Sequence, residues 1–218
     1  MALSIFDLDN TLLNGDSDYL WGQFLVDNNI VDGQHYEQKN QEFYDQYTQG
    51  TLNIHEFLAF SLKPLSEHPT EQLFQWREAF MREKILPIVH DKAVKLVDSH
   101  RQRGNTLMII TATNQFVTEP IAEHFGIPHL LATNPEMING QYTGQVEGTP
   151  CFQDGKVTRL QSWLAEHNAD LTDSWFYSDS HNDIPLLDKV SHAIAVDPDA
   201  SLQQYATEQQ WDIISLRE

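Results

Sequence analysis

Hydrophobic residues follow two different spacing patterns along the chain. Residues 2–8 form a short apolar run between polar residues, which predicts a buried strand. From about residue 16 to residue 82 the apolar residues recur at helical spacing, and Gly33, Gly50 and Pro69 mark breaks between helices. The clearest amphipathic segments are residues 19–26, 57–62 and 73–81. The first third of the chain therefore predicts one strand followed by several helices.

After Pro87 strands and helices alternate. The apolar runs that predict strands are residues 106–110, 129–132, 174–178, 193–196 and 211–215. The segments that predict helices are residues 93–103, 116–125, 157–167 and 184–189. Asn139 and Gly140, within residues 137–146, predict a tight hairpin turn. The alternation indicates an α/β fold with a Rossmann-like parallel sheet and helices on both faces.

The predicted first strand is isolated in the sequence, because about 70 residues with helical character separate it from the next strand. The simplest topology inserts this strand into the later sheet. We therefore expect residues 1–15 and 86–218 to form one core, and residues 16–85 to form a helical cap inserted between its two parts.

The chain is strongly acidic, and its charge excludes several classes of partner. Its 218 residues include 32 Asp and Glu but 13 Lys and Arg, a formal net charge of −19. Such a field repels nucleic acids and anionic lipid, so we expect no nucleic acid and no membrane as partner. The N-terminus lacks the pattern of a signal peptide, and Cys151 has no second cysteine to pair with. We expect a cytoplasmic protein.

Polar side chains with useful chemistry stand where three predicted strands end. Asp7 and Asp9 follow the first strand, Thr111 follows the second, and Asp179 follows the strand at residues 174–178. Ligands of open parallel sheets bind beyond the carboxyl ends of the strands. Carboxylates gathered at that edge are costly without a cation, and Mg²⁺ suits one or two carboxylates together with a phosphate. The pattern favours a magnesium site that handles a phosphate compound.

The segment DLDNT at residues 7–11 carries the most specific chemistry. A carboxylate can attack phosphorus and form an aspartyl-phosphate. A second acid two residues later can protonate the leaving oxygen and then deprotonate water. Such a short motif also arises by chance in an acidic chain, so its meaning depends on the other motifs.

Four motifs in order resemble the haloacid dehalogenase superfamily, and the resemblance covers the whole chain. They are DLDNT at residues 7–11, the apolar strand that ends in Thr111, Lys156, and the acid pair Asp179 and Asp183. The helical insert after the first motif resembles the cap of the phosphoserine-phosphatase-like branch. Within that branch, TATN at residues 111–114 and PCF at residues 150–152 are similar to a bacterial histidinol-phosphatase-like group.

The resemblance implies a Mg²⁺-dependent phosphatase and assigns a role to each matching residue. Asp7 would be the nucleophile and a metal ligand, and Asp9 would be the general acid and base with its carbonyl on the metal. Lys156 would neutralise Asp7 and the phosphoryl group. The other implied positions are Asp179 as a metal ligand, Asp183 as a metal ligand or a support of the ligands, and Thr111, Thr113 and Asn114 at the phosphate.

Several functions remain open besides a phosphomonoesterase. Asp9 argues against dehalogenase and phosphonatase chemistry, since those branches lack this second acid. A phosphotransferase with an alcohol acceptor would use the same residues, and a non-enzymatic binding module is the alternative of a different class. Phosphoserine phosphatases of similar cap type carry a cap arginine for the substrate carboxylate, but residues 54–63 contain no Arg.

The start of the predicted cap suggests what the small phosphate ester carries. Asp16 and Asp18 follow Asp7 by nine and eleven residues. In the phosphoserine-phosphatase branch this region resembles the place where an acid meets the substrate ammonium. We therefore expect an amino-alcohol phosphate, such as histidinol phosphate, as the substrate. Either aspartate could instead cap the first helix of the cap.

Overall fold

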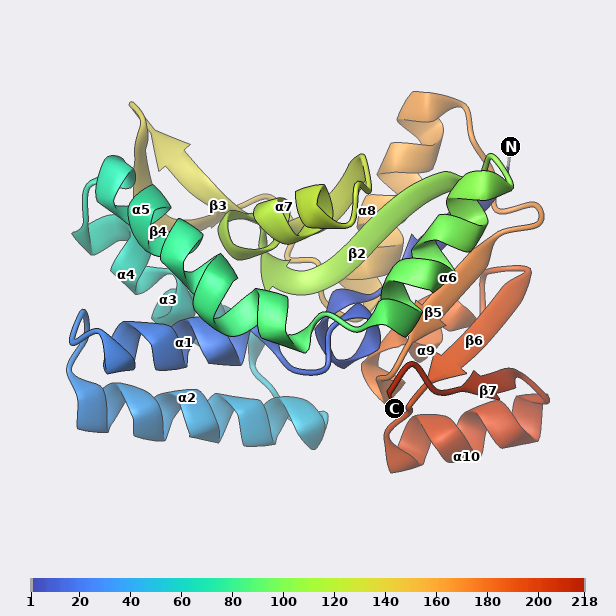
Figure 1. Cartoon of the computed structure of the whole chain (residues 1–218), viewed down its shortest axis with the longest axis horizontal. Coiled ribbons are helices and arrows are strands. Elements are labelled where there is room, and N and C mark those ends of the chain that lie inside the picture. Colours follow the sequence, from blue (N-terminus) through green and yellow to red (C-terminus); the bar gives the residue numbers. More distant parts are fainter. Residues whose placement is uncertain (1, 218) are drawn as a thin grey trace.

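The computed structural model describes residues 2–217, and within them one seven-stranded sheet forms the centre of the molecule (Figure 1). β1 (Leu3–Phe6) lies in the middle of the sheet, between β2 (Thr106–Asn114) and β5 (Trp175–Ser178). The outer strands are β3 (His129–Ile138), β4 (Gln141–Glu147), β6 (His192–Val196) and β7 (Asp212–Ile214). Their order is β4-β3-β2-β1-β5-β6-β7. The insertion of the first strand into the later sheet is confirmed.

Both faces of the sheet are covered by helices, as the alternation predicts. Side chains of α6 (Asp91–Gln102) and α7 (Gln115–His124) join one hydrophobic cluster with Phe6. Those of α8 (Asp154–His167), α9 (Ile184–Leu187) and α10 (Ala200–Gln209) join a second cluster with Leu3 and Ile5. Successive residues of a strand point to opposite faces, so β1 contributes to both clusters.

Residues 17–85 are helical and connect β1 to α6. The helices are α1 (Ser17–Asp27), α2 (Gly33–Thr48), α3 (Ile54–Ser61), α4 (Lys63–Glu67) and α5 (Thr70–Phe80), and a π-helical turn, Met81–Ile85, follows. Trp21 of α1 packs edge-on against Phe80 of α5 and Phe116 of α7, so the hydrophobic core continues from the sheet into these helices. The division of the chain into a core and a cap stays a prediction.

Two details of the sheet differ in extent from the sequence prediction. β2 and β3 each run several residues beyond the predicted apolar runs. β3 continues into an antiparallel pairing with β4, so the sheet is mostly rather than wholly parallel. The hairpin turn is confirmed: Asn139 and Gly140 have φ of 54° and 80°, the positive values that a tight hairpin requires.

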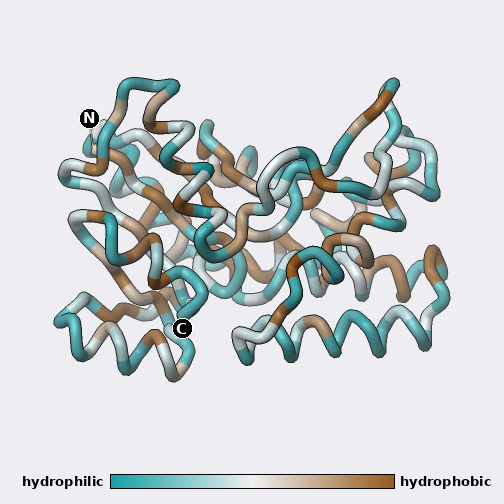
Figure 2. Tube along the Cα trace, turned by 180° about the vertical axis from the view of Figure 1, so that it is seen from behind, coloured by the Kyte–Doolittle hydropathy of each residue, from teal (hydrophilic) through white to brown (hydrophobic). Residues whose placement is uncertain are grey.

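α2 gave little hydrophobic signal in the sequence, and the structure shows why. Most of the helix is hydrophilic along its length (Figure 2), and its buried residues are Asn40 and Phe43. A helix that buries so little does not show the apolar stripe by which amphipathic helices are recognised. No helix within residues 2–217 combines the length and apolar character needed to cross a bilayer.

Candidate active site

A turn directly after β1 positions the first two acids. The backbone N–H of Asp7 donates to the carbonyl of Tyr177 at 2.9 Å, which anchors Asp7 to β5 at the carboxyl edge of the sheet. The chain then turns through Leu8–Leu12, where Asn10 has a φ of 55° and donates its N–H to Gly15. Asn tolerates this left-handed conformation better than most residues. The DLDNT segment thus forms a sharp turn in which its acids stand at a strand end.

Asp7 lies in a buried ion cluster with Lys156 and Asp183. The Lys156 Nζ donates to Asp7 Oδ1 at 2.8 Å and to Asp183 Oδ2 at 2.8 Å. Its side chain is 3% exposed, and those of the two acids are similarly buried. The Ser178 hydroxyl donates to the same oxygen of Asp183 at 2.7 Å. The structure therefore brings the predicted lysine from the first turn of α8 against the acid that follows β1.

Thr11 joins Asp7 to Asp179. Its hydroxyl lies 3.5 Å from Asp7 Oδ2 and 3.1 Å from Asp179 Oδ1, and it accepts the backbone N–H of Asp179 at 3.0 Å. The second oxygen of Asp7 and one oxygen of Asp179 therefore both lie near the Thr11 hydroxyl, whereas Lys156 contacts the other oxygen of Asp7. Thr11 belongs to the first motif, but no role was predicted for it from the sequence.

Asp9 lies at the start of the helical region and contacts β2. Its Oδ1 accepts the backbone N–H of Ser17 at 2.6 Å. Its Oδ2 accepts the hydroxyls of Thr113 at 2.8 Å and Thr111 at 3.4 Å. The pairing of β2 with β3 shifts register between Ile110 and Asn114, and such an irregularity can re-aim side chains at a strand end. Asp9, Thr111 and Thr113 are thereby grouped as the sequence predicted.

Asn114 takes a different position from the two threonines. Its side-chain oxygen accepts the backbone N–H of Val117 at 3.2 Å, and it is the N-cap of α7. Capping is the preferred role of Asn at a helix start. The contact of Asn114 with phosphate, expected from the sequence, remains a prediction that would have to use its backbone.

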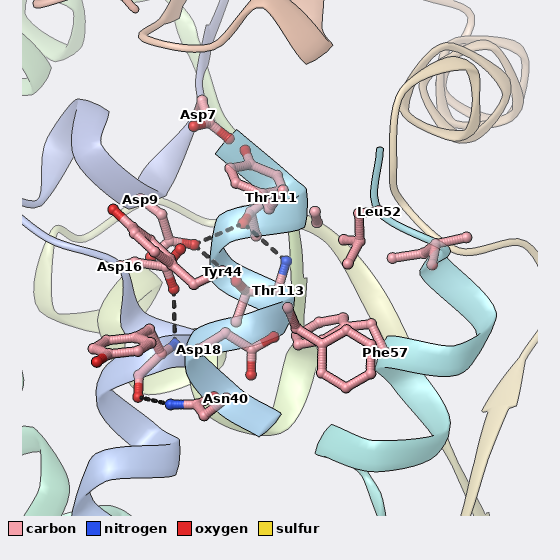
Figure 3. Close-up of a pocket in the computed structure, with 15 residues that line it drawn as sticks. Asp7, Asp9, Asp16, Asp18, Asn40, Tyr44, Leu52, Phe57, Thr111 and Thr113 are labelled. Carbon is pink, nitrogen blue, oxygen red and sulfur yellow. Dashed lines mark hydrogen bonds between the residues drawn. The ribbon is translucent and has the colours of Figure 1, made fainter. Parts of the chain in front are cut away.

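A cavity begins at Asp7, Asp9, Thr111 and Thr113 and is lined further along by residues of α1, α2 and α3 (Figure 3). Its acidic lining residues are Asp7, Asp9, Asp16 and Asp18. Its aromatic lining residues are Tyr19, Phe43, Tyr44, Tyr47 and Phe57. Among residues 2–217, no Lys, Arg or His side chain lines it. The α2 residues of this wall carried no sequence signal, since they belong to no motif and their helix is mostly polar.

Asp16 and Asp18 differ in their surroundings although both line the cavity. Asp16 is the N-cap of α1, and its Oδ1 accepts the backbone N–H of Tyr19 at 2.8 Å. Asp18 follows in the first turn of α1 and is buried. Asp16 therefore caps a helix, which is one of its two predicted roles. It also lies on the cavity wall, where it can contact a ligand.

Burial dominates the electrostatics of the acids. It raises the pKa of Asp7 to about 7, although the charge of Lys156 opposes the rise. Burial likewise raises the pKa of Asp9 and of Asp179, and for Asp179 the charges of Asp7 and Asp183 add to the effect. Burial alone would lower the pKa of Lys156, but the charges of Asp183 and Asp7 raise it above its ordinary value. Lys156 is therefore a permanent cation among acids that its charge does not fully balance.

Comparison with known proteins places this site in a family. Residues 5–188 match the haloacid dehalogenase-like hydrolase family, a range that includes each acid of the site and Lys156. The chain belongs to this family. The sequence resemblance is thus confirmed. The relatives described next show that the chain is a phosphatase.

Two relatives are named for different phosphatase activities. A histidinol-phosphatase of Neisseria meningitidis serogroup C (strain 8013) is 42% identical, with 99% of each chain covered. A phosphoserine phosphatase of Mycobacterium tuberculosis (strain ATCC 25618 / H37Rv) is 29% identical, over 99% of this chain and 71% of that protein. Both names describe phosphatases.

Solved structures agree on the fold. A protein of unknown function from Bordetella pertussis Tohama I superposes with a TM-score of 0.94 at 42% identity, with 99% of each chain covered. A phosphoserine phosphatase, solved as a phospho-aspartyl intermediate analogue, superposes with a TM-score of 0.72 at 20% identity over 100% of this chain and 94% of its own. At that identity the likeness shows the α/β fold alone.

Proposed function

We propose that the chain is a Mg²⁺-dependent phosphomonoesterase that passes through an aspartyl-phosphate on Asp7 and acts on a small amino-alcohol phosphate such as histidinol phosphate. The observation that carries the proposal is the position of Asp7. Its buried carboxylate is held by Lys156 at one end of a cavity whose other charged lining residues, within residues 2–217, are acidic. That arrangement suits a phosphate at Asp7 and a cationic remainder in the cavity.

Asp7 and Asp9 divide the chemical steps. A carboxylate oxygen of Asp7 attacks phosphorus, the bond from phosphorus to the ester oxygen breaks, and that oxygen takes a proton from Asp9. Asp9 then accepts a proton from the water that attacks the aspartyl-phosphate, which releases phosphate and restores Asp7. Burial raises the pKa of Asp9, and this favours the protonated form that the first step needs.

The residues around Asp7 fit a bound Mg²⁺. Asp7 Oδ2 and Asp179 Oδ1 both lie within 3.5 Å of the Thr11 hydroxyl, and Lys156 is engaged on the other oxygen of Asp7. Two carboxylates with oxygen ligands from the backbone match the preference of Mg²⁺, which keeps several waters. No set of three His, Cys, Asp or Glu side chains in residues 2–217 is grouped to hold a metal. Bound there, Mg²⁺ would neutralise charge on the phosphoryl oxygens.

The proposed ligands are Asp7, Asp179 and the backbone carbonyl of Asp9. Asp183, expected from the sequence as a ligand or a support, has contacts that favour the second role. Both Lys156 and Ser178 donate to its carboxylate. We propose that Asp183 holds Lys156 in place. Thr111, Thr113 and the amides at the start of α7 are proposed to contact the phosphoryl oxygens, since they lie at the same edge and a helix start favours an anion.

Lys156→Met is expected to lower kcat by about a hundredfold to a thousandfold, because the variant loses a fixed cation beside the phosphoryl group. It is also expected to be less stable by roughly 3–5 kcal/mol, since two buried acids lose their partner. Phosphate release, measured well below the melting temperature of the variant, separates the two effects. Lys189→Met, at an exposed lysine, is the control. A kcat that stays normal while only stability falls would make Lys156 purely structural.

Asp16 is proposed to bind the amine of the substrate. Asp16→Asn is expected to raise KM for amine-bearing esters by roughly tenfold to a hundredfold, the loss of a charge-assisted hydrogen bond of about 1.5–3 kcal/mol. Asn caps a helix about as well as Asp, so α1 and the melting temperature should change little.

A phosphate-release panel tests the substrate class. It compares histidinol phosphate, aminoethyl phosphate, phosphoserine and phenyl phosphate in the wild type and in Asp16→Asn. We expect the two amine esters without a carboxylate to be preferred, because the cavity wall within residues 2–217 offers no cation for the carboxylate of phosphoserine. A preference for phosphoserine, or an equal loss on all four esters in Asp16→Asn, would contradict the proposed selection.

A further inference from the structure

Asp18 is a buried acid to which the proposed reaction gives no role. It is 9% exposed and lines the cavity. Asp9 and Asp16 accept backbone N–H groups of Ser17 and Tyr19, whereas no group among residues 2–217 donates a hydrogen bond to the side chain of Asp18. A buried carboxylate without a donor is unfavourable. Its presence on a cavity wall therefore points to a donor that arrives with a ligand.

The groups that face Asp18 do not compensate its charge. Burial and the charges of Asp16 and Asp9 raise its pKa well above the ordinary value. On α2, the charge of Asp18 adds to the effect of burial in raising the pKa of Tyr36, but Tyr36 makes no hydrogen bond to Asp18. A ligand that brings an N–H or a positive charge would relieve this unfavourable environment, and an anionic one would worsen it.

Asn40 of α2 adds a second acceptor at the same end of the cavity. Its Nδ2 donates to the carbonyl of Tyr19 at 2.9 Å, and its Oδ1 accepts nothing from residues 2–217. Gly22 allows this approach, because a Cβ there would lie 2.6 Å from the Asn40 Nδ2. The amide is thus locked between α1 and α2 beside the cavity.

Two phenylalanines complete this end of the cavity. Phe43 and Phe57 line it with ring centroids 5.5 Å apart at an interplanar angle of 68°. Leu52 and Ile54 extend the apolar wall. A flat ring can pack against such a wall, and an edge-to-face or stacked arrangement adds about 0.5–1.5 kcal/mol to the burial of its area.

The labelled residues follow one another along the cavity in Figure 3. Asp7 lies at one end, Asp9 and Asp16 lie in the middle, and Asp18 lies with Asn40 and Phe57 at the other end. The charge of Asp7 acts on Asp16, whereas the neighbours that act on Asp18 are Asp16 and Asp9. The two acids of α1 thus face different parts of a bound ester.

We propose that Asp18 and Asn40 bind the ring N–H of a heteroaromatic group that packs against Phe43 and Phe57. The inference rests on the proposed function. It makes the substrate class a phosphate monoester with two separate nitrogen groups: an amine at Asp16 and a nitrogen heterocycle with a ring N–H at Asp18. Asp18, rather than Asp16, then distinguishes this class from other amine esters.

A matched pair of substrates tests the subsite. Histidinol phosphate and phenylalaninol phosphate share the phosphate and the amine, and they differ in whether the ring carries an N–H. We expect the wild type to prefer histidinol phosphate in kcat/KM by about tenfold or more, because a site built to accept a hydrogen bond discriminates against a ligand that lacks the donor. Equal use of the two esters by the wild type would overturn the subsite without any variant.

Asp18→Asn is expected to reduce this preference to within about threefold, mainly through KM for histidinol phosphate. Asp16→Asn should slow both esters and keep the preference. Asp32→Asn, at an exposed aspartate before α2, is the matched control. The melting temperature of Asp18→Asn should stay or rise, since an unpartnered buried carboxylate is removed.

The outcomes separate the two proposals. If Asp18→Asn keeps the full preference, or lowers both esters equally with a lower melting temperature, Asp18 has no recognition role and the subsite is refuted, while the proposed phosphatase acting on amine esters stands. If the wild type does not prefer either amine ester over phenyl phosphate, the proposed function itself is wrong, and the subsite is refuted with it.

Discussion

Asp7→Asn is expected to reduce turnover of every phosphate ester on the order of 10⁴-fold or more, the scale on which enzymes respond to loss of a nucleophile. An amide oxygen is not a competent nucleophile toward phosphorus, so no aspartyl-phosphate can form. The fold should persist, because Lys156 keeps its contact with Asp183 at 2.7 Å. Steady-state phosphate release, with the melting temperature of the same preparation, measures both parts.

The matched control for this substitution is Asp91→Asn, at an exposed aspartate in the first turn of α6. Asp and Asn at such a position differ little in helix stability, and the site lies outside the cavity lining. It should retain wild-type activity. If Asp7→Asn keeps turnover within tenfold of the wild type on any ester, the covalent route is ruled out.

Removal of Mg²⁺ is expected to lower activity by roughly a thousandfold, since metal catalysis supplies several kcal/mol of transition-state stabilisation. The reason lies in the arrangement of charges. Lys156 donates to Asp7 Oδ1 and to Asp183, whereas Asp7 Oδ2 and Asp179 Oδ1 lie within 3.5 Å of the Thr11 hydroxyl. Without a cation there, a phosphate dianion would meet two acids.

The measurement uses protein treated with excess chelator, then dialysed and supplied again with Mg²⁺. Activity should return with added Mg²⁺, and the melting temperature should rise with Mg²⁺ concentration as binding to the folded state requires. Asp179→Asn should need more Mg²⁺ for the same effect. Full turnover in excess chelator, or a melting temperature that does not change with Mg²⁺ concentration, would contradict the proposed site.

The parts of the fold that followed from the sequence are those with strong local signals. The apolar run of β1 is short and fully buried, that of β5 is buried except at Trp175, and Gly104 and Gly126 follow α6 and α7 with φ of 74° and 62°. The hairpin at Asn139 and Gly140 was predicted, but the continuation of β3 through residues 133–136 was not, because Pro135 and the polar residues around it do not have the pattern of a strand. Its pairing with β4, rather than its own composition, makes this segment a strand.

The residues of the site likewise divide into those that could be predicted from the sequence and those that could not. Residues at the ends of strands, such as Asp7 and Asp179, could be grouped from sequence because the carboxyl ends of parallel strands share one edge. Lys156 was found through the family motif, and no composition rule would have singled it out. Asn40 and Phe57 could not be found, since their place on the cavity depends on how α2 packs against α1 and how α3 packs against β4.

The most direct test of the account looks for the phosphoryl group on the enzyme. The wild type and Asp7→Asn are mixed rapidly with Mg²⁺ and histidinol phosphate, quenched in acid at a series of times, digested, and analysed by mass spectrometry. We expect the wild-type peptide that contains Asp7 to gain the mass of one phosphoryl group during turnover and to lose it as substrate is exhausted, with no such gain in Asp7→Asn. Phosphate release at the full rate, with that peptide unmodified at every time, would contradict the proposed mechanism.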